Sequence, residues 1–158
     1  MTNVKSRVEA FRRMIGLVPI ESILELSYNK KYNLSTLAKV RDYSMLAASI
    51  GVRSSLPFKD NSSDLVLLHN TLSHITPDSL QQLVNEIIRV ANTFVLVIDQ
   101  YSFSEEQVGN IWKRDYATVF YHLRAIDWGD LTKEDGFEDE PYWWLFEKIK
   151  LPFTLEFV

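Results

Sequence analysis

The chain has 158 residues, of which 46% are hydrophobic and 24% charged, and this suits one domain spanning residues 1–158 with its own core. A formal net charge of -4 argues against nucleic-acid binding through a general attraction to phosphates. The sequence has no cysteine, no apolar leader and no run of 18 apolar residues. These features exclude disulfides and thiolate metal sites, and we expect a cytoplasmic protein without membrane association.

The first elements follow from the spacing of apolar residues. An apolar residue at every third or fourth position predicts an amphipathic helix from Val4 to Ile15, which ends before Gly16. Residues 22–26, with the sequence SILEL, are a short apolar run of strand length.

The next segment gives weaker signals. We expect a short helix at residues 34–38, an extended piece near Val40 and a helix through residues 45–50 that stops at Gly51.

The pattern is clearer beyond this point. Residues 64–69, with the sequence DLVLLH, form a nearly continuous apolar run, as expected for a strand covered on both faces of a parallel sheet. A helix should follow over residues 76–92, because Thr76 can cap it and Pro77 suits its first position. Residues 93–99 then read as the next buried strand.

The last third of the sequence predicts a helix and two paired strands. Ser104 and Gln107 have the spacing of a capping box, which predicts a helix that continues toward Leu123. The sequences RAIDWG and PYWWLFEKI flank a polar, acidic connection and should pair as strands. Alternation should place the side chains of Tyr142, Trp144 and Phe146 on one face of the second strand. Residues 151–158 suit an edge strand or a docked tail.

The alternation of strands and helices predicts an α/β fold. We expect a doubly wound, mostly parallel sheet of about six or seven strands that ends in an antiparallel hairpin. Such sheets bind ligands at the carboxyl ends of their strands. The polar residues to consider are therefore those that end or follow strands.

Several motifs carry a family resemblance. ILEL, an LPF segment ahead of the DLV strand, LQQLVNEIIRV and FVLVID together resemble class I S-adenosylmethionine-dependent methyltransferases. More narrowly, ESILEL, LSHITPDSL, WKRDYA and PYWWLFEK resemble the methylase family associated with pseudaminic acid biosynthesis. The resemblance covers roughly residues 20–149. It implies a compact Rossmann-like methyltransferase fold with S-adenosylmethionine as cofactor.

The resemblance also implies a cofactor site, and the chain departs from its pattern there. Glu25 matches the acid at the end of the first strand, and Ser27 and Asn29 belong to the loop that is glycine-rich in the family. Asp42 is the best match to the acid that holds the ribose hydroxyls at the end of the second strand. Because a glycine lets the backbone approach the cofactor, its replacement by Ser27 and Lys31 puts cofactor binding in doubt.

Each candidate substrate or catalytic residue has two readings. His69 and Asn70 end a buried strand, where His69 could move a proton or could simply be a structural histidine. Arg114 could bind the carboxylate of an acidic sugar, or it could lie with Asp115 on a solvated helix face.

The remaining candidates are an imidazole and a phenol. His74 could contact substrate or merely position the helix that follows it. Tyr101 could stack on a ring of a ligand. The three histidines lack metal-ligand spacing, so no metal site is expected.

Two functions remain open at this point. One is S-adenosylmethionine-dependent methyl transfer to a small, sugar-like acceptor, in which proximity and orientation supply most of the rate enhancement. The other is a non-catalytic relative that has lost the cofactor site and binds a protein partner or another small ligand. The sequence alone leaves the oligomeric state open.

Overall fold

The computed structural model describes the backbone of residues 4–16, 18–28, 44–49 and 55–149. The strands in this part are β1 (Ser22–Ser27), β2 (Ser44–Ser49), β3 (Ser63–His69), β4 (Ala91–Asp99), β5 (Glu106–Val108), β6 (Ile111–Lys113), β7 (Arg124–Asp130) and β8 (Tyr142–Glu147). The helices are α1 (Val4–Ile15), α3 (Pro77–Val90) and α4 (Tyr116–Val119), and a 3-10 turn, η1, spans Leu72–His74.

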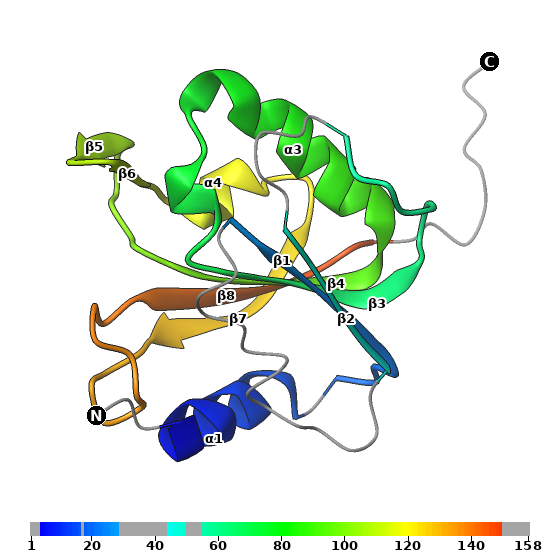
Figure 1. Cartoon of the computed structure of the whole chain (residues 1–158), viewed down its shortest axis with the longest axis horizontal. Helices are drawn as coiled ribbons and strands as arrows, with labels where there is room; N and C mark the ends of the chain where they lie inside the picture. Colours follow the sequence, from blue (N-terminus) through cyan, green and yellow to red (C-terminus); the bar gives the residue numbers. More distant parts are fainter. Residues whose placement is uncertain (1–3, 17, 29–43, 50–54, 150–158) are drawn as a thin grey trace.

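One mixed sheet organises the molecule. Its strand order is β2-β1-β3-β4-β8-β7, in which the first four strands are parallel and β8 runs antiparallel to both of its neighbours. Figure 1 shows α1 on one face of the sheet and α3 with α4 on the other. The structure therefore confirms the predicted α/β sheet, which has six strands among the described residues and ends in an antiparallel hairpin.

The core has one layer on each face of the sheet. Leu24 and Leu26 point toward α3, whereas Ile23 belongs to the layer under α1. In β8, Trp144 and Phe146 join the α3 layer and Leu145 joins the other, as the predicted alternation requires.

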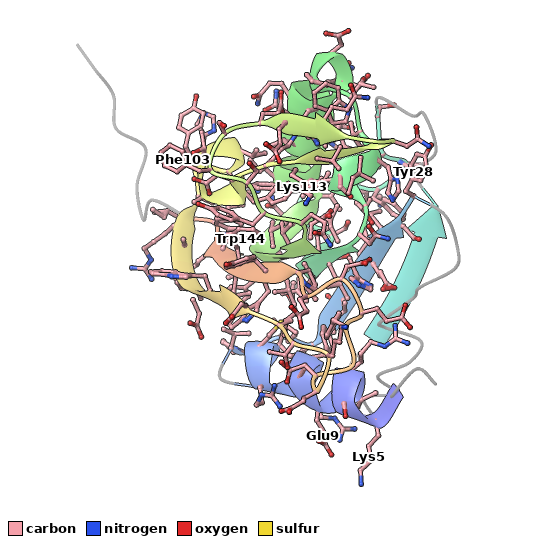
Figure 2. The ribbon with its side chains drawn as sticks, turned by 90° about the vertical axis from the view of Figure 1, so that its left-hand side faces the viewer. Lys5, Glu9, Tyr28, Phe103, Lys113 and Trp144 are labelled. Carbon is pink, nitrogen blue, oxygen red and sulfur yellow. The ribbon has the colours of Figure 1, made fainter. Side chains whose placement is uncertain are left out.

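The helix α1 is amphipathic, as predicted. Phe11, Met14 and Ile15 are buried, whereas Figure 2 shows Lys5 and Glu9 pointing away from the sheet. These buried residues share one hydrophobic cluster with residues of β1, β3 and β4, so the helix covers these three strands.

The LPF and DLV motifs have clear structural roles. Arg89 of α3 donates hydrogen bonds to the carbonyls of Leu56 and Phe58 at 3.0 and 2.7 Å, which fixes the LPF segment against α3. The Asp64 carboxylate accepts from the backbone N–H groups of Glu21 and Ser22 at 2.8 and 3.2 Å. These contacts set the register between the amino ends of β1 and β3.

Two predicted helices are wrong. Residues 44–49 form β2, which pairs in parallel with β1 along its whole length. Residues 106–113 form the hairpin of β5 and β6 instead of part of a long helix, and only Tyr116–Val119 is helical in that region. The loop of this hairpin is Gly109 and Asn110, and Gly109 has φ of +60°, which suits a type II′ turn.

Smaller differences between prediction and structure concern the ends of the helices and the segments outside the described residues. Thr76 occupies the N-cap position of α3 as predicted, but its side chain makes no capping hydrogen bond. Pro77 is the first residue of the helix, as expected. The predicted elements at residues 34–38, near Val40 and at 151–158 lie outside the described residues.

Candidate functional site

A cleft opens at the carboxyl ends of β3 and β4, on the face of the sheet that carries α1. It encloses about 90 Å³, and we refer to it as the strand-end cleft. The strand ends supply His69, Asn70, Ile98, Asp99 and Gln100, the connection between β7 and β8 supplies Gly136, Phe137, Glu138, Asp139 and Pro141, and α1 supplies Arg7. This edge is where parallel α/β sheets bind ligands.

The two predicted catalytic residues, His69 and Asn70, both line the strand-end cleft. His69 ends β3, and its ring meets the ring of Phe137 edge-on with centroids 5.5 Å apart. Asn70 follows directly, and its backbone N–H donates to the carbonyl of Ile98 at 2.9 Å. Both residues line the strand-end cleft, so the predicted placement of these two is compatible with a ligand site.

The connection between β7 and β8 is held firmly against the body of the protein. The Leu131 N–H donates to the carbonyl of Pro141 at 2.8 Å, which closes the connection at its base. Asp135 forms an ion pair with Arg13 of α1 at 2.7 Å. Phe137 is buried under α1. The residues that this connection adds to the cleft therefore have a fixed place.

Two residues at or beside the cleft have a left-handed backbone conformation. Among the described residues, three that are not glycine have positive φ, and two of them are Asn70 (51°) and Glu140 (46°). The left-handed conformation is costly for a residue with a Cβ, and residues in it cluster at functional sites. Asparagine adopts this conformation readily, so the strained residue of the two is Glu140, which lies between Asp139 and Pro141 of the cleft.

Hydrogen bonds tie the segment of residues 70–75, which follows β3, to β1 and β4. The Thr71 hydroxyl donates to the carbonyl of Leu26 in β1 at 2.9 Å. The Ser73 N–H donates to the Asp99 carboxylate at 3.1 Å. Burial raises the pKa of Asp99 and outweighs the opposing hydrogen bonds from Gln100 and Ser73.

The end of β1 holds two predicted cofactor residues. Glu25 is 1% exposed and Ser27 is 7% exposed, and both have interaction partners within the protein. By the alternation of β1, both side chains lie on the α1 face together with Ile23. Since β1 lies next to β3 in the sheet, this places Glu25 and Ser27 on the same side as the strand-end cleft.

The end of β2 lacks the acid that the family pattern requires. β2 ends with Ala47, Ala48 and Ser49, and no carboxylate occurs between Ser49 and Ser55 in the sequence. Asp42 lies outside the described residues, and in the sequence it precedes β2 instead of following it. The sequence of β2 and of the residues after it therefore offers no carboxylate for this position, and the role predicted for Asp42 stays a prediction. Asn29 also lies outside the described residues.

His74 contacts the residue that follows β1. Its ring stacks on Tyr28 with centroids 4.6 Å apart and planes 8° apart. His74 therefore bridges the ends of β1 and β3 and does not line the strand-end cleft. This placement agrees with the reading in which His74 positions the segment before α3.

Arg114 is buried on the other face of the sheet and is not on a helix. Its three guanidinium nitrogens donate to the Glu105 carboxylate at 2.7 Å and to the carbonyls of Leu72 and Ile75, both at 2.6 Å. The ion pair of Arg114 is therefore with Glu105 instead of Asp115. The side chain is 1% exposed, and its hydrogen bonds to the carbonyls of Leu72 and Ile75 hold η1 in place; we refer to these contacts as the Arg114 clamp.

Asp115 caps α4, because its carboxylate accepts from the Ala117 N–H at 3.1 Å. Arg114 and Asp115 both line a second groove of about 320 Å³ between α3, α4 and the segment before β5.

Tyr101 is partly exposed and contacts Tyr142, with ring centroids 4.9 Å apart. The predicted substrate residues are thus spread over several places, and none of them joins His69 and Asn70 in the cleft.

Several residues of the cleft were not predicted from the sequence, namely Arg7, Phe137, Glu138 and Asp139. The acidic connection around Gly136 was visible in the sequence, but nothing local indicated that it returns to the end of β4. In the part of the chain that the structure describes, no group of three or more His, Asp or Glu side chains could hold a metal ion.

The chain is similar to methyltransferases in part of its sequence and in its fold. Residues 20–93, slightly under half of the chain, match the family model described as a methyltransferase domain. Solved structures of similar fold include an S-adenosylmethionine-dependent methyltransferase from Aquifex aeolicus. It is 12% identical, with a TM-score of 0.64 over 90% of this chain and 89% of that one. The chain has the class I methyltransferase fold.

Two further solved structures show how widely this methyltransferase fold is matched. A methyltransferase from Methanosarcina mazei is 11% identical, with a TM-score of 0.62 over 87% of this chain and 97% of that one. The 1,6-didemethyltoxoflavin N1-methyltransferase of Burkholderia thailandensis, solved with S-adenosylhomocysteine, is 11% identical, with a TM-score of 0.64 over 93% and 78%. No curated protein matches the chain.

The methyltransferase fold accounts for the arrangement described above. The likeness to the solved structures concerns the fold, and the family match covers β1, β2, β3 and α3 and ends within β4. None of the helices in the described ranges is long and apolar enough to cross a membrane.

Proposed function

We propose that the chain transfers a methyl group from S-adenosylmethionine to a small acceptor bound in the strand-end cleft. The observation that carries this proposal is the meeting of His69 and Asn70 with the connection between β7 and β8 at the carboxyl edge of a methyltransferase-type sheet. The acceptor that we favour is sugar-like, as the resemblance to the methylases associated with pseudaminic acid biosynthesis implies. The mixture of imidazole, amide and carboxylate groups in the cleft suits a ligand with several hydroxyl or amino groups.

The residues of this chain would act mainly by position. S-adenosylmethionine supplies an electrophilic methyl group when it is bound. His69 can accept the proton that the acceptor loses, since its ring faces the cleft. Asn70 can hydrogen-bond the acceptor and hold it in line. Phe137 excludes water from one side of the His69 ring.

The fit of the cofactor to the described residues is partial. Glu25 is present at the end of β1, on the same face as the cleft. The end of β2, however, presents Ala48 and Ser49 where the family has an acid. Ser27 also adds a Cβ where the family has a glycine.

This partial fit supports a second candidate function. A protein with the same scaffold that no longer binds S-adenosylmethionine would serve as a binding module for a protein partner or a different small ligand. The specific observation in its favour is the absence of a carboxylate from β2 and from residues 50–55.

One titration distinguishes the two functions. Isothermal titration calorimetry with S-adenosylmethionine and with S-adenosylhomocysteine should give micromolar binding that is lost in Glu25→Ala. Glu21→Ala, which changes an exposed acid before the same strand, is the matched control and should bind normally. No heat at millimolar ligand would exclude methyl transfer and leave the binding-module function.

A further inference from the structure

The charged groups at the strand-end cleft define the class of acceptor more narrowly. Glu138 and Asp139 line the cleft from the connection between β7 and β8, and both are exposed to solvent. In the described ranges, neither carboxylate takes part in an ion pair. The cleft itself, together with His69 and Asn70, locates the site, and the two carboxylates give its mouth a negative charge.

The backbone that carries the two carboxylates is held in place by the structure around it. The carbonyl of Asp139 accepts a hydrogen bond from the side-chain amide of Gln100 at 3.3 Å, which ties it to the end of β4. The next residue, Glu140, is in the left-handed conformation, and Phe137 is buried. A carboxylate on a fixed backbone loses less entropy when it binds a ligand than one on a free loop.

The cations near this site are already engaged. Arg114, the residue that the sequence offered for a substrate carboxylate, donates to Glu105, Leu72 and Ile75 on the opposite face. Arg7 does line the cleft, but it is 5% exposed and has an interaction of its own. An acidic ligand would therefore meet Glu138 and Asp139 at the mouth before it reached a cation.

We infer that the strand-end cleft selects an acceptor that carries an ammonium group, such as an amino sugar, and rejects an acidic one. This inference rests on the proposed function, because it names the acceptor class of the same site. Glu138 and Asp139 receive the ammonium group, Phe137 packs against the apolar side of the ligand, and Asn70 and Gln100 bond its hydroxyl groups.

Three probes with the same ring test the inference: glucosamine, glucose and glucuronate. Saturation-transfer NMR and titration of the Asn70 and Gln100 side-chain amide signals measure their binding to the full chain. Glucosamine should bind about tenfold more tightly than glucose, as expected for two surface carboxylates, and glucuronate should bind least. The preference should shrink at high salt, because the carboxylates are exposed.

Variants locate the origin of the preference. Glu138→Gln with Asp139→Asn should bring glucosamine and glucose to equal affinity. The control, Asp130→Asn with Glu134→Gln, removes the same charge from nearby positions that do not line the cleft and should keep the preference. Tighter binding of glucuronate, a preference that survives Glu138→Gln with Asp139→Asn, or binding of none of the probes would overturn the inference.

This test is independent of the cofactor. The probes are measured without S-adenosylmethionine, so a chain that fails the cofactor titration can still show the ammonium preference. Conversely, cofactor binding without any preference among the probes would keep methyl transfer and reject the ammonium-bearing acceptor.

Discussion

The imidazole of His74 lies almost parallel to the phenol ring of Tyr28, with 8° between the planes and 4.6 Å between the centroids. Tyr28 is the first residue after β1 and His74 is the last residue of η1, so the pair joins the carboxyl ends of two neighbouring strands. These are the strand ends at which the proposed ligands bind, and the following predictions concern the contacts that keep them together.

The stacked pair should stabilise the protein by about 1 kcal/mol, which is typical of aromatic pairs. In a double-mutant cycle, Tyr28→Ala and His74→Ala should show a coupling of about this size in urea denaturation. Tyr121→Ala is the control, because Tyr121 contacts His122 but is 69% exposed, and it should change stability by less than about 0.5 kcal/mol. A coupling near zero would show that the stack does not hold the two strand ends together.

Loss of the Arg114 clamp should be far more costly. Arg114→Ala leaves the carbonyls of Leu72 and Ile75 without a donor and should lower the free energy of unfolding by about 3 kcal/mol. Hydrogen exchange should locate the effect, with faster exchange of the Ile75 N–H, which bonds the carbonyl of Leu72.

Glu105→Gln is the matched control for this prediction. The glutamine keeps an acceptor for the Nε–H of Arg114, so the loss in the free energy of unfolding should be smaller than that caused by Arg114→Ala. An equal loss for both variants would indicate that the ion pair, and not the two carbonyls, accounts for the stabilisation by Arg114.

Asp99 should make the folded state less stable as the pH rises. Burial raises its pKa above the ordinary value of 3.8, so the folded state binds this proton more tightly than the unfolded state does. The destabilisation by the Asp99 carboxylate is absent below pH 3.8. It grows as the pH rises toward the pKa of Asp99 in the folded state, and it is complete above that pKa. The wild-type protein should therefore lose stability relative to Asp99→Asn between pH 3 and neutrality in urea titrations.

Asp135 should show the opposite sign. Burial opposes ionisation there, but the hydrogen bonds from Thr132 and Arg13 dominate and hold the pKa of Asp135 below its ordinary value. Its stabilising contribution is present above 3.8 and is lost as the pH falls through the lowered pKa. Relative to Asp135→Asn, the wild-type protein should lose stability in acid, and the same slope for both aspartates would contradict the assignments.

The loop after β1 should limit cofactor affinity. Ser27→Gly combined with Lys31→Gly removes side chains where the family has glycines, and it should tighten S-adenosylhomocysteine binding about tenfold in calorimetry. Ser27→Ala, which keeps the Cβ, should leave the affinity unchanged. If the glycine variant also leaves it unchanged, the side chains at positions 27 and 31 do not limit cofactor affinity.

The strands of the sheet could be predicted largely because each is an apolar run with a polar end. This holds for residues 22–26, 64–69 and 93–99, and for the alternation around Trp144. β2 was predicted as a helix because its Met, Leu and Ala residues favour helices locally. Parallel pairing with β1 overrides that helical preference. The sequence of residues 44–49 alone does not reveal that they pair with β1.

The hairpin of β5 and β6 was missed although a signal existed. Gly109 and Asn110 are a two-residue loop between short strands, and this dipeptide is typical of hairpins. The capping-box spacing of Ser104 and Gln107 favoured a helix instead. One reading of Arg114 therefore placed it on the solvated face of this helix, but residues 106–113 form a hairpin and Arg114 is buried.

The candidate site could be predicted only where it depends on a single strand. His69 and Asn70 follow directly from the end of β3. The contribution of Glu138 and Asp139 depends on how the connection between β7 and β8 folds back toward β4, and that of Arg7 depends on the placement of α1. These are contacts between distant segments, which the spacing of residues along the chain does not reveal.

The position of β8 in the sheet has a consequence for synthesis. β8 lies between β4 and β7, so the backbone edge of β4 has no neighbour on that side until residues 142–147 have left the ribosome. Until then, the nascent chain presents an open apolar strand edge of the kind that promotes aggregation. Arrest of translation within the acidic connection before β8 should therefore yield chains that depend on chaperones, even though most of the sheet has already been made.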